Sequence, residues 1–151
     1  MAGRYFEQWA VGDRIAHDIR RTVTETDNLL FSVLTHNPQP LHLDAEYARA
    51  SEFGRIVVNS TFSFSLMIGL TVADTTLRTM VANLGYDRIR TAHPVFIGDT
   101  LRAETHVVEV RESRSRPEAG IVVFGHSLLN QRDEMVCECL RTALLNRCPP
   151  A

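Results

Sequence analysis

A short proline-rich segment carries the residues best suited to acid–base chemistry. Residues 35–44 read THNPQPLHLD, with two histidines and an aspartate around two prolines. Proline lacks a backbone donor and restricts the residue before it, so this segment is expected to be a fixed loop. Imidazole titrates near neutral pH and a rigid loop holds it in place, so His42 is the candidate general acid or base. His36 ends the preceding helical pattern, and there we expect a helix-end role.

A second candidate lies eighteen residues after His42, in the segment VVNST. Asn59 or Ser60 can cap the apolar helix that follows, and the first N–H groups of a helix lack intrahelical partners. Such N–H groups stabilise negative charge that develops on an oxygen. The Ser60 N–H is therefore a candidate oxyanion donor close to the His42 loop.

A third candidate is the segment RTAHPVFIGDTL, which begins at Arg90 and otherwise reads as a turn before a strand. A guanidinium pairs well with phosphate or carboxylate, so Arg90 is a candidate ligand-binding residue. The alternative is a solvated surface arginine.

Helical patterns surround the first two candidates. Residues 14–23 alternate as a strand does, and Thr26 or Asp27 can then cap a helix that leads to the proline-rich loop. Asp44 can cap a further short helix. From Ser60, roughly 13 residues are apolar almost all the way round the helix, which is typical of a buried helix.

The second half of the chain is predicted to be sheet. Four segments rich in Val, Thr, Leu and Ile are separated by polar turns. The economical arrangement is a single antiparallel sheet wrapped around the buried helix, an α+β architecture, with open edges that favour a homodimer.

Composition limits the class of protein. A length of 151 residues fits one domain over 1–151, and a net charge of −2 gives no electrostatic case for binding nucleic acid or an anionic membrane. The longest apolar run is too short to span a bilayer, and the first residues lack the apolar core of a signal peptide, so we expect a cytoplasmic protein. Cys137, Cys139 and Cys148 include no CxxC pair, which favours reduced thiols over a disulfide framework or a metal site.

Together the three motifs resemble those of the MaoC-like dehydratases, the family of the (R)-specific enoyl-CoA hydratases. The family signature is D-x-N-P-L-H-x-D, then I-x-H-G, then R-x-x-x-P-V-x-x-G-D-x-L, and the spacings agree with this chain. The resemblance implies a hotdog fold with short helices in an overhanging segment. It also implies an acyl-CoA thioester substrate, no separate cofactor because coenzyme A is part of the substrate, and assembly from two hotdogs.

The resemblance assigns roles to matching positions. His42 matches the catalytic histidine, Asp44 the aspartate that follows it, and Ser60 the oxyanion-hole position. Arg90 matches a residue that contacts the CoA thioester ligand. By the same matching, Gln39 and Asn59 are expected to bind substrate or CoA.

Three positions depart from the family pattern. Asn37 stands where relatives have their catalytic aspartate, Gln39 replaces an asparagine, and Asn-Ser replaces His-Gly at residues 59–60. An amide cannot take up a proton at neutral pH. We therefore expect His42 to take the proton of a water that the Asn37 side-chain carbonyl positions.

For the substrate, the chain looks most like the branch of the family that acts on short branched or dicarboxylic enoyl-CoAs, such as mesaconyl- or itaconyl-CoA. Arg55 and Arg90 are the candidate partners for a second carboxylate. Two alternatives remain open: a non-catalytic acyl-CoA-binding hotdog or inactive subunit, with Asn37 as the lesion, and a hotdog thioesterase. The thioesterase needs a carboxylate on the central helix, and residues 60–73 contain none.

Overall fold

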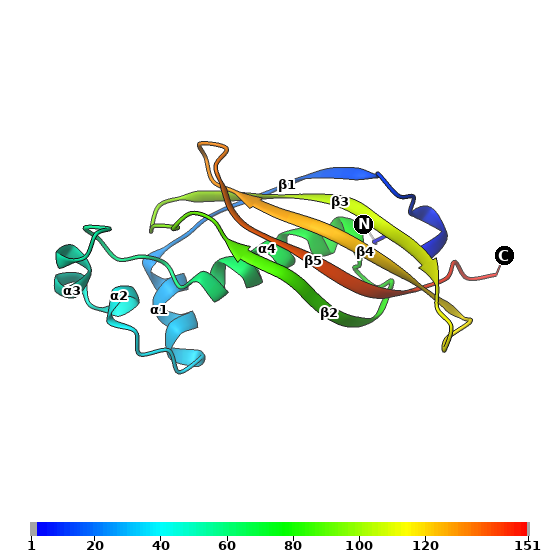
Figure 1. Cartoon of the computed structure of the whole chain (residues 1–151), viewed down its shortest axis with the longest axis horizontal. Coiled ribbons are helices and arrows are strands. Elements are labelled where there is room, and N and C mark those ends of the chain that lie inside the picture. The colour runs from blue at the N-terminus through cyan, green and yellow to red at the C-terminus, as the bar shows by residue number, and fades with distance from the viewer. Residues whose placement is uncertain (1–2, 151) are drawn as a thin grey trace.

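The computed structural model describes residues 3–150 and consists of one sheet packed against one long helix (Figure 1). The five strands are antiparallel to their neighbours in the order β1-β3-β4-β5-β2, so the predicted α+β architecture is confirmed. The elements in chain order are η1 (Phe6–Gln8), β1 (Arg14–Thr22), α1 (Glu25–Leu34), α2 (Pro40–Leu43), α3 (Ala45–Ala50), α4 (Ser60–Thr75), β2 (Met80–Thr91), β3 (Thr100–Glu112), β4 (Ala119–Leu129) and β5 (Met135–Asn146). The boundaries 1–151 of a single domain stay a prediction.

The alternation of side chains along the strands builds the core against α4. The register pairs Ala103 of β3 with Leu128 of β4, and Leu128 with Cys137 of β5. Residues that are paired directly point to the same face, so this apolar row faces the helix. Met67 of α4 packs in the same cluster and is fully buried, as is Leu128.

Helix α4 is longer and less covered than the sequence predicts. It runs for 16 residues, and Asn59 caps it, which confirms one of the two expected caps. Its fully buried residues recur at helical spacing and lie on one face: Ser63, Met67, Leu70, Thr71 and Thr75. The prediction that this helix is buried was wrong for part of its surface. The sheet covers only one face of the helix and leaves Ser65 and Gly69 exposed.

Helices α1, α2 and α3 extend beyond one end of the sheet, as the overhanging segment was expected to do (Figure 1). The predicted cap of α1 at Thr26 or Asp27 was wrong. Thr24 caps the helix, because its hydroxyl accepts from the Asp27 N–H while the Asp27 carboxylate accepts from the Thr24 N–H. This reciprocal capping satisfies two backbone N–H donors at once and starts the helix earlier.

The three cysteines are free thiols: Cys137 and Cys139 are buried on β5 and Cys148 is exposed. The first two share one core cluster, as their spacing on a strand predicts. Within residues 3–150, no helix has the length and apolar character needed to cross a membrane.

Candidate active site

The segment around His42 is a short helix and not the predicted loop, because Pro40 begins α2 and proline is tolerated in the first turn of a helix. A backbone hydrogen bond fixes the ring of His42 in this helix. The Nδ1 atom lies 2.7 Å from the carbonyl oxygen of Val57. Because a carbonyl oxygen can only accept, Nδ1 carries the proton, and Nε2 of the neutral imidazole keeps its lone pair. The Val57 N–H donates to the Leu41 carbonyl at 3.2 Å, which closes the chain from 41 to 57 into a loop beside His42. The ring is therefore held in the tautomer that a general base needs.

Asn28 of α1 joins this loop to the start of α4. Its side chain is 2% exposed. Nδ2 donates to the His42 carbonyl at 2.8 Å, and Oδ1 accepts from the Asn59 N–H at 2.9 Å. One turn further along α1, the buried Ser32 hydroxyl accepts from Asn59 Nδ2 at 3.3 Å. Asn28 thus holds His42 and the first turn of α4 in a fixed relation.

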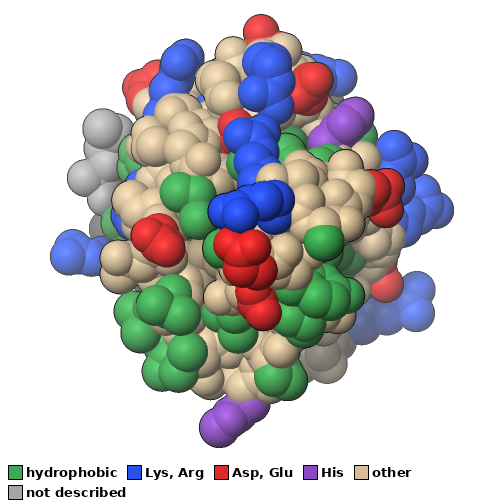
Figure 2. Space-filling model, turned by 90° about the vertical axis from the view of Figure 1, so that its left-hand side faces the viewer, with side chains coloured by type: hydrophobic (Ala, Val, Ile, Leu, Met, Phe, Trp, Pro, Cys, Tyr) green, Lys and Arg blue, Asp and Glu red, His purple; other side chains and the backbone are tan. Residues whose placement is uncertain are grey.

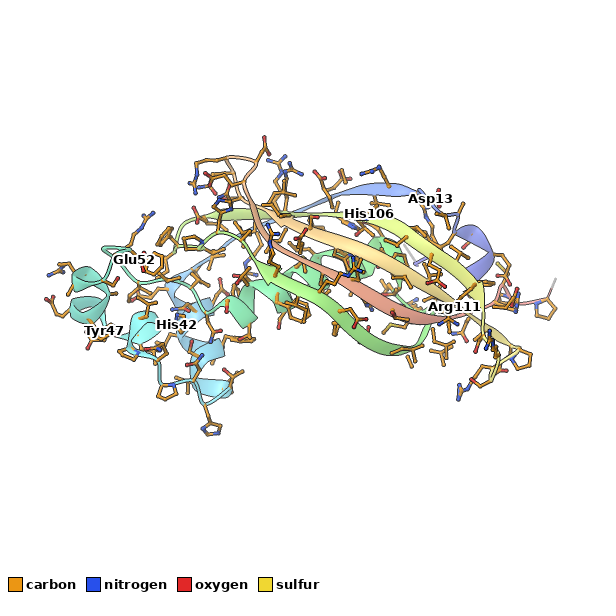
Figure 3. The ribbon with its side chains drawn as sticks, in the orientation of Figure 1. Asp13, His42, Tyr47, Glu52, His106 and Arg111 are labelled. Carbon is orange, nitrogen blue, oxygen red and sulfur yellow. The ribbon has the colours of Figure 1, made fainter. Side chains whose placement is uncertain are left out.

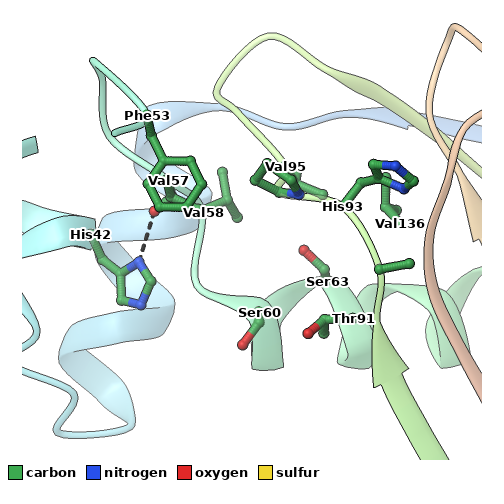
Figure 4. Close-up of a pocket in the computed structure, with 12 residues that line it drawn as sticks. His42, Phe53, Val57, Val58, Ser60, Ser63, Thr91, His93, Val95 and Val136 are labelled. Carbon is green, nitrogen blue, oxygen red and sulfur yellow. Dashed lines mark hydrogen bonds between the residues drawn. The ribbon is translucent and has the colours of Figure 1, made fainter. Parts of the chain in front are cut away.

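His42 and Ser60 line one cavity of about 300 Å³ (Figure 4). Ser63 and His93 are further polar groups of its wall. The rest of the wall is mostly apolar: Phe53, Val57, Val58, Thr91, Ala92, Pro94, Val95 and Val136. The structure thus brings two of the predicted residues together, at the end of the molecule that α1 to α3 build (Figure 3).

The cap of α4 leaves its first N–H for another partner. Asn59 Oδ1 accepts from the Thr61 N–H at 3.1 Å and from the Thr61 hydroxyl at 2.6 Å, and not from the Ser60 N–H. The N-terminus of a helix also carries a positive partial charge. No acidic residue lies in the first turn of α4 to offset that charge. The cap therefore does not use the Ser60 N–H, which stays the candidate oxyanion donor.

The other residues predicted around His42 shape the loop. Asn37 Oδ1 accepts from the Gln39 N–H at 3.1 Å, a local turn that precedes α2. Asp44 caps α3, as predicted, by accepting from two backbone N–H groups. Neither Asn37 nor Gln39 is among the residues that line the cavity, so their proposed contacts with substrate stay predictions. His36 is exposed at the end of α1 with φ 53°, and its N–H bonds to the Val33 carbonyl, which fits the expected helix-end role.

Three residues predicted to bind ligand are engaged elsewhere. Asn59 is 2% exposed, and its side chain is used in the cap and in the bond to Ser32. Arg90 lies exposed on β2, with Nε 3.5 Å from Glu138 Oε1. The Arg55 guanidinium stacks on the Phe96 ring at 3.8 Å. Neither arginine lines the cavity, and the ligand contacts predicted for these three residues stay predictions.

A second polar cluster is buried between α4 and the sheet. His17 lies 2.7 Å from Asp74 of α4 and 2.7 Å from the Thr105 hydroxyl, which in turn lies 2.8 Å from His126 Nδ1. Burial, followed by the nearby Arg141 charge, lowers the pKa of His126 to about 3. None of these residues lines the cavity of His42, and residues 3–150 contain no cluster of His, Cys, Asp or Glu suited to a metal ion.

Sequence reasoning missed Asn28, Ser63 and His93. A polar residue in an otherwise apolar helix was the available signal for Ser63. Asn28 gave no such signal, because the apolar side chains of α1, which sequence reasoning would bury, are the exposed ones. For His93 the only signal was its place next to a proline in the third motif. Each acquires its place through contacts between elements that lie far apart in the chain.

Comparison with known proteins gives consistent results. The model of the family described as MaoC like domain matches residues 6–126. The chain is 38% identical over 146 residues to the mesaconyl-CoA hydratase of Cereibacter sphaeroides, which covers 97% of this chain and 42% of that protein. This chain therefore spans less than half the length of that relative.

Solved structures agree with the fold. A monoamine oxidase regulatory protein from Archaeoglobus fulgius is 33% identical with a TM-score of 0.87, over 99% of this chain and 98% of that one. A conserved hypothetical protein from Mycobacterium tuberculosis with a double hotdog fold is 23% identical with a TM-score of 0.88, over 99% of this chain and 46% of that one. The predicted hotdog fold is confirmed. Because the family model matches most of its length, this chain belongs to the family of MaoC-like domains.

Proposed function

We propose that this chain catalyses the reversible hydration of a short, branched or dicarboxylic enoyl-CoA thioester. The observation that carries the proposal is the hydrogen bond from His42 Nδ1–H to the Val57 carbonyl, which leaves Nε2 as a base in the cavity that Ser60 also lines. The mesaconyl-CoA hydratase of Cereibacter sphaeroides supports the choice of substrate class.

The proposed reaction uses the two groups in sequence. Nε2 of His42 removes a proton from water as the water oxygen bonds to C3 of the enoyl group. The electron pair of the C2=C3 bond moves to the thioester oxygen, where the Ser60 N–H stabilises the negative charge. The protonated His42 then returns its proton to C2 as the enolate collapses. Water has been added across the double bond, and the imidazole is neutral again.

Replacement of His42 tests the proposal. We expect His42→Ala to lower kcat for hydration of mesaconyl-CoA by about a hundredfold or more, because the general base is lost. The matched control is His36→Asn, since His36 is exposed on the same segment and asparagine tolerates its positive φ. Unchanged turnover in His42→Ala would refute the role of this residue.

Replacement of Asn37 tests what the amide does. In Asn37→Asp the side-chain oxygen still accepts from the Gln39 N–H, so the turn is expected to persist. The new carboxylate restores the pair found in relatives. If the wild type is active and the variant gains activity toward straight-chain crotonyl-CoA alone, the asparagine selects the substrate.

The alternative favoured by Asn37 is a subunit that binds acyl-CoA without turning it over. This alternative would be supported if the wild-type protein binds acyl-CoA thioesters tightly but hydrates none of a panel of enoyl-CoAs. Hydration activity in Asn37→Asp would then identify Asn37 as the cause of the inactivity. A thioesterase is disfavoured by the position of the carboxylate on α4. Asp74 is in the last turn of the helix, and it is paired with His17 at 2.7 Å.

We also propose that two copies of the chain pair. β2 is an edge strand of the sheet and exposes Leu84 and Ile89, each 51% exposed. Helix α1 exposes further apolar side chains: Leu29, Leu30, Val33 and Leu34. Figure 2 shows hydrophobic side chains gathered on the lower part of the end built by α1 to α3. Sedimentation equilibrium should give twice the 17.0 kDa chain mass, and a monomer at micromolar concentration would contradict the pairing.

A further inference from the structure

Ser63 places an unused hydroxyl in the wall of the cavity. It lies on α4 one turn after Ser60 and is 3% exposed. Its Oγ atom is buried and has no hydrogen-bond partner within the described residues. Its neighbours in the wall include Val58, Val95 and Val136, none of which offers a side-chain acceptor. A buried hydroxyl without a partner costs free energy, so this position favours a ligand that accepts a hydrogen bond.

His93 supplies a second group at the same cavity. Its Nδ1 lies 2.8 Å from the Met135 carbonyl oxygen, which fixes the proton on Nδ1 and leaves Nε2 for another partner. Figure 4 shows Ser63 between His42 on one side and His93 on the other. His93 is exposed, so it lies at the rim of the cavity and not in its floor.

These two residues take the place of the arginines that the sequence suggested for a second carboxylate. Arg55 is stacked on Phe96 and Arg90 is paired with Glu138, and neither lines the cavity. Among the described residues of the wall, only His42 and His93 can carry a positive charge. If His42 is the base, His93 is the remaining residue of this wall that can carry the charge.

We propose that Ser63 and His93 bind the distal carboxylate of a dicarboxylic acyl group. The Ser63 hydroxyl donates to one carboxylate oxygen, and the protonated His93 donates to the other through Nε2–H. A carboxylate bound beside the His93 imidazole favours the protonated ring, which is the form that donates through Nε2–H. The volume of about 300 Å³ is at the small end for ligand sites and suits a short acyl group. The inference rests on the proposed function for its substrate class.

Binding of unreactive analogues tests this without requiring turnover. Methylsuccinyl-CoA carries the distal carboxylate, and 2-methylbutyryl-CoA has a methyl group in its place. We expect the wild type to prefer the dicarboxylic analogue in isothermal titration. Ser63→Ala and His93→Asn should each reduce the preference, as the ratio of the two Kd values, by about tenfold or more, the effect of one hydrogen bond to a charged group. Asparagine keeps a donor for the Met135 carbonyl while removing the cation.

The control is Ser65→Ala, because Ser65 lies on the same helix but is exposed. It should keep the wild-type ratio. An equal loss of affinity for both analogues in Ser63→Ala would overturn the proposal, since Ser63 would then serve the thioester or the helix. A wild type without preference would overturn it as well. If the preference and its loss are observed but no enoyl-CoA is hydrated, the carboxylate site stands and the proposed reaction fails. If crotonyl-CoA is hydrated and the preference is absent, the proposed reaction stands and the proposed carboxylate site fails.

Discussion

Asn28 should control both the stability of the protein and the position of its base. In Asn28→Ala the buried Asn59 N–H loses its acceptor and the part-buried His42 carbonyl loses its donor. An unpaired buried backbone group costs about 1–3 kcal/mol, and water can reach the second group, so we expect a loss of about 2–4 kcal/mol in the free energy of unfolding. For a chain of this size that corresponds to a fall in Tm of roughly 4–16 °C.

Asn28→Asp separates the two roles. One carboxylate oxygen still accepts from the Asn59 N–H, while the other replaces Nδ2 and faces the His42 carbonyl with like partial charge. The start of α4 is then retained while the His42 backbone is pushed away. Because a displacement of about 1 Å can cost about a hundredfold in rate, we expect kcat to fall roughly ten- to a hundredfold with little change in KM.

Thermal unfolding by circular dichroism and steady-state hydration of mesaconyl-CoA measure the two effects. Ser32→Ala is the matched control, because it removes the 3.3 Å bond to Asn59 but leaves the His42 carbonyl paired. It should lower Tm slightly and keep kcat. An unchanged kcat in a folded Asn28→Asp protein would refute this prediction, because it would show that the position of His42 does not depend on Asn28.

Two further predictions concern the core. Burial lowers the pKa of His126 to about 3, whereas the unfolded imidazole titrates near 6.5. Between these values the unfolded chain binds the extra proton, so the free energy of unfolding should fall as the pH is lowered, by up to about 1.4 kcal/mol per pH unit. Urea unfolding at pH 4 to 7 checks this, and His126→Gln should have a shallower slope; an equal slope would assign the effect to other groups. Burial also raises the pKa of Cys137 to about 11 and that of Cys139 to about 12, so only the exposed Cys148 should react with a thiol reagent before unfolding. Rapid reaction of a second thiol in the folded protein would contradict this.

The fold could be predicted wherever local pattern and tertiary burial agree. The strands of the second half were recognisable because Val, Thr and Leu alternate between polar turns, and residues 130–134 turn between β4 and β5 as expected. Helix α4 was predicted from its apolar composition, but composition does not reveal that the sheet covers only one of its faces. The start of α1 was misplaced because Thr24, Thr26 and Asp27 all have capping side chains, and only the reciprocal bonds between Thr24 and Asp27 decide among them.

The candidate site was predictable in part for the same reason. His42 and Ser60 were identified because prolines restrict the backbone beside His42 and a helix start has unpaired donors, both of which are local properties. That they share a cavity follows from Asn28 and Val57, whose bonds join segments 14 to 31 residues apart in the chain. The arginines were chosen for their charge, but they lie outside the cavity wall, and their contacts with ligand stay predictions. The charge of a residue does not indicate whether its side chain faces the cavity or the solvent.

The hydrogen bond between Val57 and Leu41 has a consequence for how substrate range can change. It closes the chain on itself, so the intervening segment with α3 is a side branch whose two ends meet next to the base. His42 is held by Val57 and Asn28, neither of which belongs to α3. Phe53, which does lie in the branch, forms part of the cavity wall. On the proposed function, insertions or replacements in residues 45–56 should therefore change which acyl group fits the cavity while His42 keeps its place, so substrate range and catalytic rate would change separately in this chain.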